Sequence, residues 1–393
     1  MSNDSVVIVN GARTPMGGLQ GCLSTVPATE LGSTAIRAAV ERSGVPAHDI
    51  DEVFMGCVLP AGLKQCPARQ AAIGADIPKS TGAVTVNKAC GSGMQAAIFG
   101  YDSIVAGTNK IVLAGGLESM SNAPHMIVGA RAGVRTGNGK LYDHMFLDGL
   151  EDAYTGRAMG TFAQETADER GLTREQMDAF AIESLNRAKK AIDDGSLAAE
   201  ITPVTVSSRK GATVITDDEQ PHQAAVEKIP GLRPAFAKEG TITAANSSSI
   251  SDGASALVLM SGTEAEQRGL APMARIVGHA RHSQAPEEFT IAPVGAVHKL
   301  FEKTGWTAAD VDLFEINEAF AMVTMMAIDD LGLDHAQVNI HGGACAQGHP
   351  IGSTGSRIIV SLMYALKKLG KSRGVAALCI GGGEATAVAI EML

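Results

Sequence analysis

The spacing of hydrophobic and polar residues predicts an alternation of strands and helices along this chain of 393 residues. Residues 83–86 alternate in the β-branched manner of a strand, glycines interrupt the pattern at 91 and 93, and a helical pattern begins at Met94. Between about 175 and 190, apolar side chains recur at helical spacing, which is typical of a helix with one face packed on a core. Its apolar positions are Met177, Phe180, Ala181, Ile182, Leu185 and Ala188.

Four segments from the first part of the chain recur in the same order in the last part. The pairs are Val6–Arg13 with Arg275–Arg281, Gly44–Phe54 with Gly305–Glu315, Val86-Asn87 with Val338-Asn339, and Ile111–Glu118 with Leu378–Glu384. This order implies two similar α/β halves. Because a duplicated fold places corresponding turns around a pseudo-twofold axis, we expect the glycine-rich turns of both halves to face one cleft.

The sequence between the two repeats has a different character. Residues 121–250 begin with a glycine-rich stretch, continue through the helical segment and end in loops rich in proline and charge. We expect residues 121–250 to form a loop or lid domain over the cleft, because long insertions are usually functional. The N-terminal half is then predicted at 1–120 together with about 251–270, and the C-terminal half at 271–393.

Composition fits a protein of this organisation. The length favours two domains or a duplicated unit. The hydrophobic fraction is 45%, aromatic residues make up only 4%, and the 45 glycines suit close packing of sheets and helices. The formal net charge of -10 argues against a nucleic-acid partner, because phosphate backbones require clustered Lys and Arg.

The six cysteines are scattered without CxxC spacing, so neither a zinc site nor a disulfide framework is indicated. Residues 1–10 contain no basic segment followed by an apolar run, and no stretch of about 18 apolar residues occurs. The last three residues are not a peroxisomal signal. We therefore expect a cytoplasmic protein with no membrane partner.

Cys90 follows the predicted strand and precedes the predicted helix. Unpaired amides and the positive end of the helix dipole favour an anion there, so the pattern predicts a thiol with increased thiolate character. Two alternatives remain open at this point. Cys90 could be inert in a buried turn, or Gly91–Ala96 could be a GxGxxA dinucleotide fingerprint with Glu118 as the ribose-binding acid.

Three further polar residues follow predicted strands or lie in glycine-rich turns of the C-terminal half. Asn317 follows a predicted strand and could simply cap the next helix. His349 precedes a proline in a turn with five glycines, which suits a general base, although a lone histidine is more often structural. Cys379 precedes three glycines whose backbone amides could form an oxyanion hole, or it could be a small hydrophobic residue.

Taken together, these segments resemble the thiolase family, the acetyl-CoA acetyltransferases and 3-ketoacyl-CoA thiolases. The likeness runs nearly end to end. The motifs that carry it are Ala12–Gly17, Val86–Gly93, Gly115–Ser121, Leu232–Phe236, Asn317–Phe320, Gly348–Gly352 and Cys379–Gly383. The resemblance implies an α/β fold of duplicated βαβαβαββ halves that form a five-layer α-β-α-β-α core, with an inserted loop domain.

The resemblance also implies catalytic roles. Cys90 would be the acylated nucleophile, His349 its activating base, and Cys379 the acid and base for the α-proton of the second acyl-CoA. One oxyanion hole would be formed by His349 and a water held by Asn317, and another by the backbone amides of Cys90 and Gly381. These residue types suit a Claisen condensation, which needs a nucleophile, a base for a weakly acidic C–H and polarisation of the thioester carbonyl.

Further residues are expected to contact coenzyme A (CoA) or the acyl group. Ser248 matches the family's pantetheine-binding serine, and the other expected pocket contacts are Met159, Phe236, Phe289 and Phe320. For the CoA phosphates we expect Arg209, Lys210 and Arg233, since arginine suits phosphate geometry; the alternative for each is a solvated surface charge.

The chain departs from the family pattern at several positions, including Cys345 and Gln347, which stand in place of apolar residues before His349. Ala158 replaces a common histidine near the acyl pocket, Pro221 stands where many members have an arginine near the adenine, and Phe289 replaces a frequent methionine. These departures bear on acyl-chain length and CoA affinity, whereas the catalytic set is intact.

The resemblance predicts a homodimeric or homotetrameric thiolase of fatty acid metabolism that takes acyl-CoA and CoA, with short chains (acetoacetyl-CoA) favoured. CoA thioesters are its substrates, and no metal or redox cofactor is required. One alternative is a medium- or long-chain thiolase of β-oxidation. Alternatives of other classes are a non-catalytic acyl-CoA or lipid carrier on the same fold and, from the GxGxxA pattern, a dehydrogenase.

Overall fold

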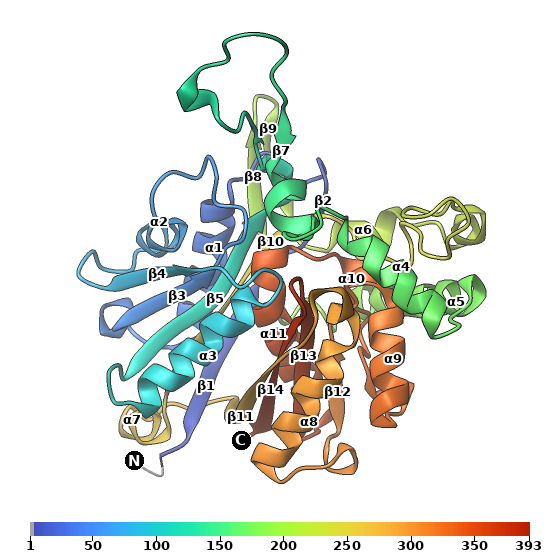
Figure 1. The fold of residues 1–393 in the computed structure, drawn as a ribbon. Helices are drawn as coiled ribbons and strands as arrows, with labels where there is room; N and C mark the ends of the chain where they lie inside the picture. The colour runs from blue at the N-terminus through green and yellow to red at the C-terminus, as the bar shows by residue number, and fades with distance from the viewer. Residues whose placement is uncertain (1–3) are drawn as a thin grey trace.

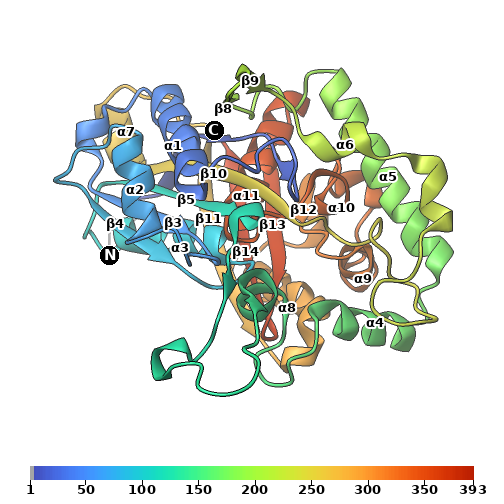
Figure 2. The ribbon, with the colours of Figure 1, turned by 90° about the horizontal axis from the view of Figure 1, so that it is seen from above.

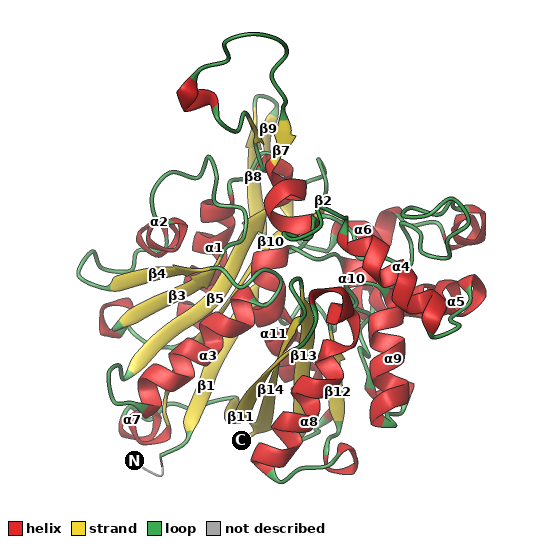
Figure 3. Cartoon of the chain, viewed as in Figure 1, coloured by secondary structure: helices red, strands yellow, loops and turns green. Residues whose placement is uncertain are grey.

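One ten-stranded sheet, built from two halves of the chain, runs through the computed structural model, which describes residues 4–393 (Figures 1 and 3). In the N-terminal half β3 runs parallel to β4 and β5, and β10 runs antiparallel to both β5 and β1. The strands of this half, in spatial order, are β1 (Val6–Arg13), β10 (Ser251–Ser261), β5 (Ile111–Ser119), β3 (Glu52–Gly56) and β4 (Gly82–Val86), with β2 (Gly17–Gly18) beside β10.

The C-terminal half repeats the mixed arrangement. Here β12 is parallel to β13, and β14 is antiparallel to both β13 and β11. The strands are β11 (Ala274–Ser283), β14 (Glu384–Met392), β13 (Arg373–Ile380) and β12 (Leu313–Ile316). The two halves join where Val6–Ile8 pair with Ala274–Ile276. These segments belong to the first pair of repeats, so the duplicated sequences meet at the centre of the molecule.

Helices form three layers around these strands. On the N-terminal half α1 (Ala28–Ser43) and α2 (Pro67–Gly74) bury one apolar cluster, and on the C-terminal half α8 (Ala292–Thr304) buries another. Between them α3 (Ser92–Val105) and α11 (Ile351–Leu369) share a third cluster with strands of both halves. Because α3 and α11 lie between the strands of the two halves, these strands form two layers of the core, and the predicted five-layer α-β-α-β-α core is confirmed.

The segment predicted as an insertion adds helices and short hairpins beside the sheet, seen in green and yellow in Figures 1 and 2. Its longest helix is α5 (Arg174–Asp193), which buries the predicted apolar face and begins with a capping box between Thr173 and Gln176. The other elements are β6 (His125–Met126), β7 (Tyr142–Asp143), a π-helical turn (Phe146–Leu150), α4 (Met159–Glu169), β8 (Val204–Ser208), β9 (Gly211–Ile215) and α6 (Glu219–Gln223).

After this segment the chain returns through β10 into the N-terminal half and continues through α7 (Gly262–Gln267) to the C-terminal half. The C-terminal half also contains α9 (Ala321–Leu331) and α10 (Ala344–Gln347). The domain boundaries set out above stay a prediction, and residues 1–3 of the first domain lie outside the described residues. Within residues 4–393, no helix is long and apolar enough to cross a membrane.

Candidate active site

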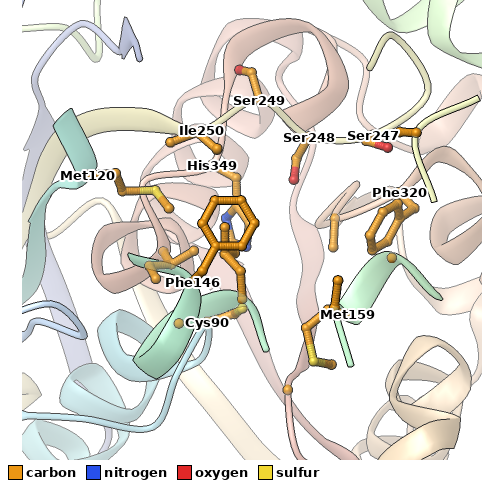
Figure 4. Close-up of a pocket in the computed structure, with 18 of the residues that line it drawn as sticks. Cys90, Met120, Phe146, Met159, Ser247, Ser248, Ser249, Ile250, Phe320 and His349 are labelled. Carbon is orange, nitrogen blue, oxygen red and sulfur yellow. The ribbon is translucent and has the colours of Figure 1, made fainter. Parts of the chain in front are cut away.

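A cavity of about 550 Å³ lies where the two halves and the inserted segment meet. Cys90 from the N-terminal half lines it together with His349 and Cys379 from the C-terminal half, and Figure 4 shows Cys90 and His349 pointing into the same space. The turns of both halves therefore face one cleft, as the repeats predict. Most of the remaining lining is apolar and includes Met120, Phe146, Leu150, Met159, Phe236, Ile250, Phe289, Phe320 and Ile351.

The turn that carries Cys90 is tightly constrained. Cys90 lies between the end of β4 and the start of α3, as predicted, and Ala89 before it has a left-handed φ of 42°. The Ser92 hydroxyl accepts a hydrogen bond from the Lys88 amide (2.8 Å) and donates one to the Ala89 carbonyl (2.6 Å). A backbone conformation that is costly for a residue with a Cβ is held in place by this bonding, which is typical of functional turns.

The surroundings of Cys90 keep its thiol protonated in the free protein. Burial raises the pKa of the Cys90 thiol to about 11, against the opposing effect of hydrogen bonds from the Gly381 and Cys90 amides. The prediction of an increased thiolate fraction from the helix N-terminus alone was therefore wrong, because desolvation outweighs it. The same two amides are the predicted oxyanion-hole donors, and that role stays a prediction.

His349 is held in its neutral form. Burial, with a smaller contribution from the Arg357 charge, lowers the pKa of His349 to about 3. The Thr354 hydroxyl donates to the Pro350 carbonyl (3.0 Å), so it must accept from His349 Nδ1 at 2.7 Å. His349 Nε2 is buried and has no hydrogen-bond partner among residues 4–393, so its lone pair is free for a substrate or a thiol.

Cys379 is the second sulfur of the cavity. It is the second-last residue of β13, two residues before Gly381, and its side chain is buried. Burial and, secondarily, the neighbouring charge of Cys90 raise the pKa of the Cys379 thiol well above its ordinary value. A thiol with this pKa is a weak acid that can protonate a carbanion and, once deprotonated, is a strong base.

Asn317 follows β12 but does not cap the next helix. The N-cap of α9 is Phe320, three residues later, so the capping interpretation was wrong. Asn317 is 1% exposed, and neither atom of its side-chain amide has a hydrogen-bond partner within the described part of the chain. Because a buried amide without partners is costly, this group fits a role in binding a water or a substrate atom.

The predicted contacts to CoA divide into two groups. The structure brings Ser248, Met159, Phe236, Phe289 and Phe320 into the cavity wall. Phe320 makes edge-on contacts with Phe236 and Phe289, at ring-centroid distances of 6.0 and 6.5 Å. The predicted phosphate contacts do not line this cavity. They are exposed, with Arg209 and Lys210 in the turn between β8 and β9, and Arg233 in the loop after α6, and their contact with phosphate stays a prediction.

Other features of the site were not found from the sequence. A second cavity of about 260 Å³ shares Gln220, Ala244 and Ser249 with the first, and Lys228 lines it. Thr354 carried no motif signal beyond its place five residues after His349. Phe146 belongs to an irregular turn whose position beside the cavity no local pattern indicates.

The dinucleotide interpretation of this region was wrong. Its ribose-binding acid would be Glu118, but Glu118 is completely buried. Its carboxylate accepts hydrogen bonds from the amides of Val58 (2.9 Å), Leu59 (3.1 Å) and Gly352 (2.9 Å). Glu118 therefore ties the end of β3 to the start of α11, and it is not available to a ligand.

The fold and the cavity define an α/β acyltransferase class, in which a buried cysteine, a neutral histidine and a second thiol share one pocket. The comparisons with known proteins agree. The family models "Thiolase, N-terminal domain" and "Thiolase, C-terminal domain" match residues 6–263 and 270–392. The chain belongs to the thiolase family.

Similar proteins cover the whole chain. The chain is 47% identical over 393 residues to an acetyl-CoA acetyltransferase of Schizosaccharomyces pombe, with 100% of both proteins covered. The crystal structure of Acat5 thiolase from Ascaris suum in complex with coenzyme A is 42% identical (TM-score 0.94; 99% of this chain and 100% of that chain). That of the Bacillus anthracis acetyl-CoA acetyltransferase is 39% identical (TM-score 0.97; 99% of each chain).

Proposed function

We propose that this protein is an acetyl-CoA C-acetyltransferase that cleaves acetoacetyl-CoA with CoA and catalyses the reverse condensation of two acetyl-CoA molecules. The observation that carries the proposal is the meeting of Cys90, His349 and Cys379 in one cavity, with His349 Nε2 free. The names of the similar proteins support the short-chain substrate.

In the first step of thiolysis, His349 takes the proton of the Cys90 thiol, and the thiolate attacks the 3-keto carbon of acetoacetyl-CoA. The bond between C2 and C3 breaks, the acetyl group stays on Cys90, and the enolate of acetyl-CoA takes a proton from Cys379. The Cys90 and Gly381 amides stabilise negative charge on the oxygen of the attacked carbonyl. His349 and a water held by Asn317 stabilise the enolate.

In the second step the Cys379 thiolate takes the proton of CoA, whose sulfur attacks the acetyl group on Cys90. The Cys90 thiolate leaves and recovers its proton from His349, so that both cysteines and the histidine return to their starting states. These are acyl and proton transfers, and the proposed reaction uses no metal or redox cofactor.

The test is thiolysis by CoA across 3-ketoacyl-CoA substrates of increasing chain length. A sharp preference for acetoacetyl-CoA is expected, because Phe289 is buried in the cavity wall against Phe320 and limits its depth. Equal or better turnover of longer chains would instead support the alternative, a medium- or long-chain thiolase. Absence of an acetylated Cys90 after incubation with acetyl-CoA would support the non-catalytic carrier.

We propose that the second cavity binds the part of CoA that the first cavity does not hold. The second cavity adjoins the first and has Lys228 in its wall. The ammonium of Lys228 suits a phosphate group. Lys228→Ala should raise the KM for CoA several-fold with little change in kcat. The matched variant Lys210→Ala, in an exposed turn, should leave both constants unchanged. A raised KM for CoA in Lys210→Ala, with no change in Lys228→Ala, would favour the phosphate contacts predicted from the sequence.

We also propose a homo-oligomer that forms at β4. This strand pairs with β3 on one side, and the described residues provide no strand on its other side. Val84 of β4 and Phe99 of α3 are 45% and 41% exposed. Such an unpaired apolar edge is suited to a second copy of the same strand. Val84→Lys should give a smaller particle in light scattering; an unchanged mass would place the interface elsewhere.

The proposed chemistry requires Cys90 and Cys379 as free thiols, which favours a reducing compartment such as the cytoplasm. All six cysteines of the chain are free in the structure. Fractionation of the source cells tests this assignment. The protein is expected in the cytoplasmic fraction, and its presence in another fraction would contradict the assignment.

A further inference from the structure

An ion pair connects the turn of the nucleophile to the turn that supplies the second oxyanion-hole amide. Lys88 lies two residues before Cys90, and its ammonium binds the carboxylate of Glu384, three residues after Gly381. The two charged side chains come from different halves of the molecule and are 21% and 34% exposed. Lys88 lies within the Val86–Gly93 motif and Glu384 ends the Leu378–Glu384 repeat, but no sequence pattern assigns a role to either side chain.

Both ends of this pair are anchored to the turns that they would hold. The Lys88 amide donates to the Ser92 hydroxyl (2.8 Å), and the Lys88 carbonyl accepts from the Gly91 amide (3.0 Å). Movement of the Lys88 backbone therefore moves the Cys90 turn with it.

Glu384 is fixed on the opposite side. It is the first residue of β14, pairs with Ile380 across the tight turn, and accepts a hydrogen bond from the Ser283 hydroxyl (3.0 Å). The turn itself contains Gly382 and Gly383 with φ values of 93° and 84°, a conformation that side chains other than glycine rarely adopt. The short rigid turn carries the Gly381 amide at a defined distance from Glu384.

The two turns also touch directly. A Cβ atom added at Gly91 would come within 2.3 Å of Ile380 Cδ1, so the Gly91 backbone packs closely against the residue that precedes Gly381. Gly381 and Cys90 line the same cavity at this junction, and the Gly381 amide opposes the rise in the pKa of the Cys90 thiol. This junction joins residues nearly 300 positions apart, and its geometry depends on how the two halves are held together.

We propose that Lys88 and Glu384 are a positioning pair that holds the Gly381 amide in place against Cys90 and so sets the geometry of this oxyanion hole. The proposal rests on the proposed function, in which Cys90 carries the acyl group. Neither residue lines the cavity, so the pair acts through the two turns and does not contact the substrate. A displaced oxyanion-hole donor stabilises the developing charge less, while substrate binding is little affected.

The first test compares Glu384→Gln with Glu391→Gln. Glu391 is the matched control because it lies at the other end of β14 and pairs with Arg275, far from the cavity. For Glu384→Gln we expect kcat for acetoacetyl-CoA thiolysis to fall about tenfold with KM changed less than twofold, since a misplacement of about 1 Å can cost up to 100-fold. Glu391→Gln should retain both constants. Equal constants in the two variants overturn the proposal.

The second readout separates positioning from charge. Removing the negative charge of Glu384 would, by electrostatics alone, favour the Cys90 thiolate and move its alkylation by iodoacetamide to lower pH. Loss of the Gly381 hydrogen bond acts in the opposite direction, because that bond favours the thiolate. We expect the alkylation profile of Cys90 in Glu384→Gln to move to higher pH. A move to lower pH, or none, overturns the positioning role.

The charge-swapped variant Lys88→Glu with Glu384→Lys restores the attraction with both groups exchanged. It should recover kcat to within about threefold of the unmodified protein, and a swap no more active than Glu384→Gln counts against the pair. Mass spectrometry of Cys90 after incubation with acetyl-CoA keeps the two hypotheses separate. If the unmodified protein forms no acetyl-Cys90, the proposed function fails; if it does and the variants behave like Glu391→Gln, only the positioning pair fails.

Discussion

Replacing Thr354 with valine tests how His349 is kept in its active tautomer. Thr354 is completely buried and does not line the cavity, and its hydroxyl accepts from His349 Nδ1 at 2.7 Å. Valine has nearly the same shape but cannot accept this hydrogen bond. The Pro350 carbonyl keeps the Ser353 and Thr354 amides as donors, at 2.8 and 3.0 Å, so only the imidazole loses its partner.

The magnitude follows from the cost of that lost partner. An unsatisfied buried donor at Nδ1 costs about 1–3 kcal/mol, and a proton on Nε2 avoids this cost when it is donated to the substrate bound in the cavity. The Nε2–H tautomer cannot accept the Cys90 proton. If the free energy of the Nε2–H tautomer falls by about 1.4–2.7 kcal/mol relative to that of the active tautomer, kcat for thiolysis falls about 10- to 100-fold. KM should change little, because no atom of Thr354 reaches the cavity.

The assay is steady-state thiolysis of acetoacetyl-CoA at saturating CoA, with Thr354→Ser as the control. Serine keeps the hydroxyl and should retain kcat within about threefold. If Thr354→Val keeps kcat within twofold of the unmodified protein, the hydroxyl does not determine the tautomer and the reasoning is refuted. A fall of the same size in Thr354→Ser would point to lost packing of the methyl group instead.

Three further predictions concern the cavity. Cys379→Ala should still become acetylated on Cys90 by acetyl-CoA but should fail to condense it, because no group then moves the α-proton; label on Cys90 followed by normal condensation would contradict this role. The rate of Cys90 alkylation should rise with pH up to about 11, because burial raises the pKa of its thiol to that value. Burial also lowers the pKa of His349 to about 3, so both groups are neutral at pH 7. A plateau reached below pH 8 would indicate a preformed thiolate. Phe289→Ala should raise kcat/KM for longer 3-ketoacyl-CoA relative to acetoacetyl-CoA, measured with a series of chain lengths. It should also lower the free energy of unfolding by about 3–5 kcal/mol, measured by denaturant titration, because Phe289 is buried. An unchanged ratio of kcat/KM would remove Phe289 from the wall of the acyl site.

Local patterns in the sequence were sufficient for the elements of this fold. The β-branched alternation before Cys90 became β4, Gly91 became the N-cap of α3, and the helical spacing between 175 and 190 became α5 with the predicted buried face. Gly93 does not interrupt the helix as predicted, because α3 begins at Ser92. The repeats predicted the two halves. These features depend on interactions between residues a few positions apart, so the sequence alone determines them.

The environment of each chemical group was decided by tertiary packing. Sequence position left Asn317 a possible cap and Glu118 a possible ribose ligand, yet folding buries Asn317 without partners and places Glu118 against three backbone amides. The helix start alone suggested an acidic Cys90, but desolvation by burial in the folded protein outweighs it.

Two contacts join residues about 290 positions apart that no local pattern connects. They are the contact of Cys90 with Gly381 and that of Lys88 with Glu384. Hydrogen-bond partners, burial and pKa depend on distance in space, whereas the periodicity of hydrophobic residues depends only on distance along the chain. For this reason the sequence alone determined the elements and the candidate residues, and only the tertiary structure decided which of them share a cavity and in which protonation state.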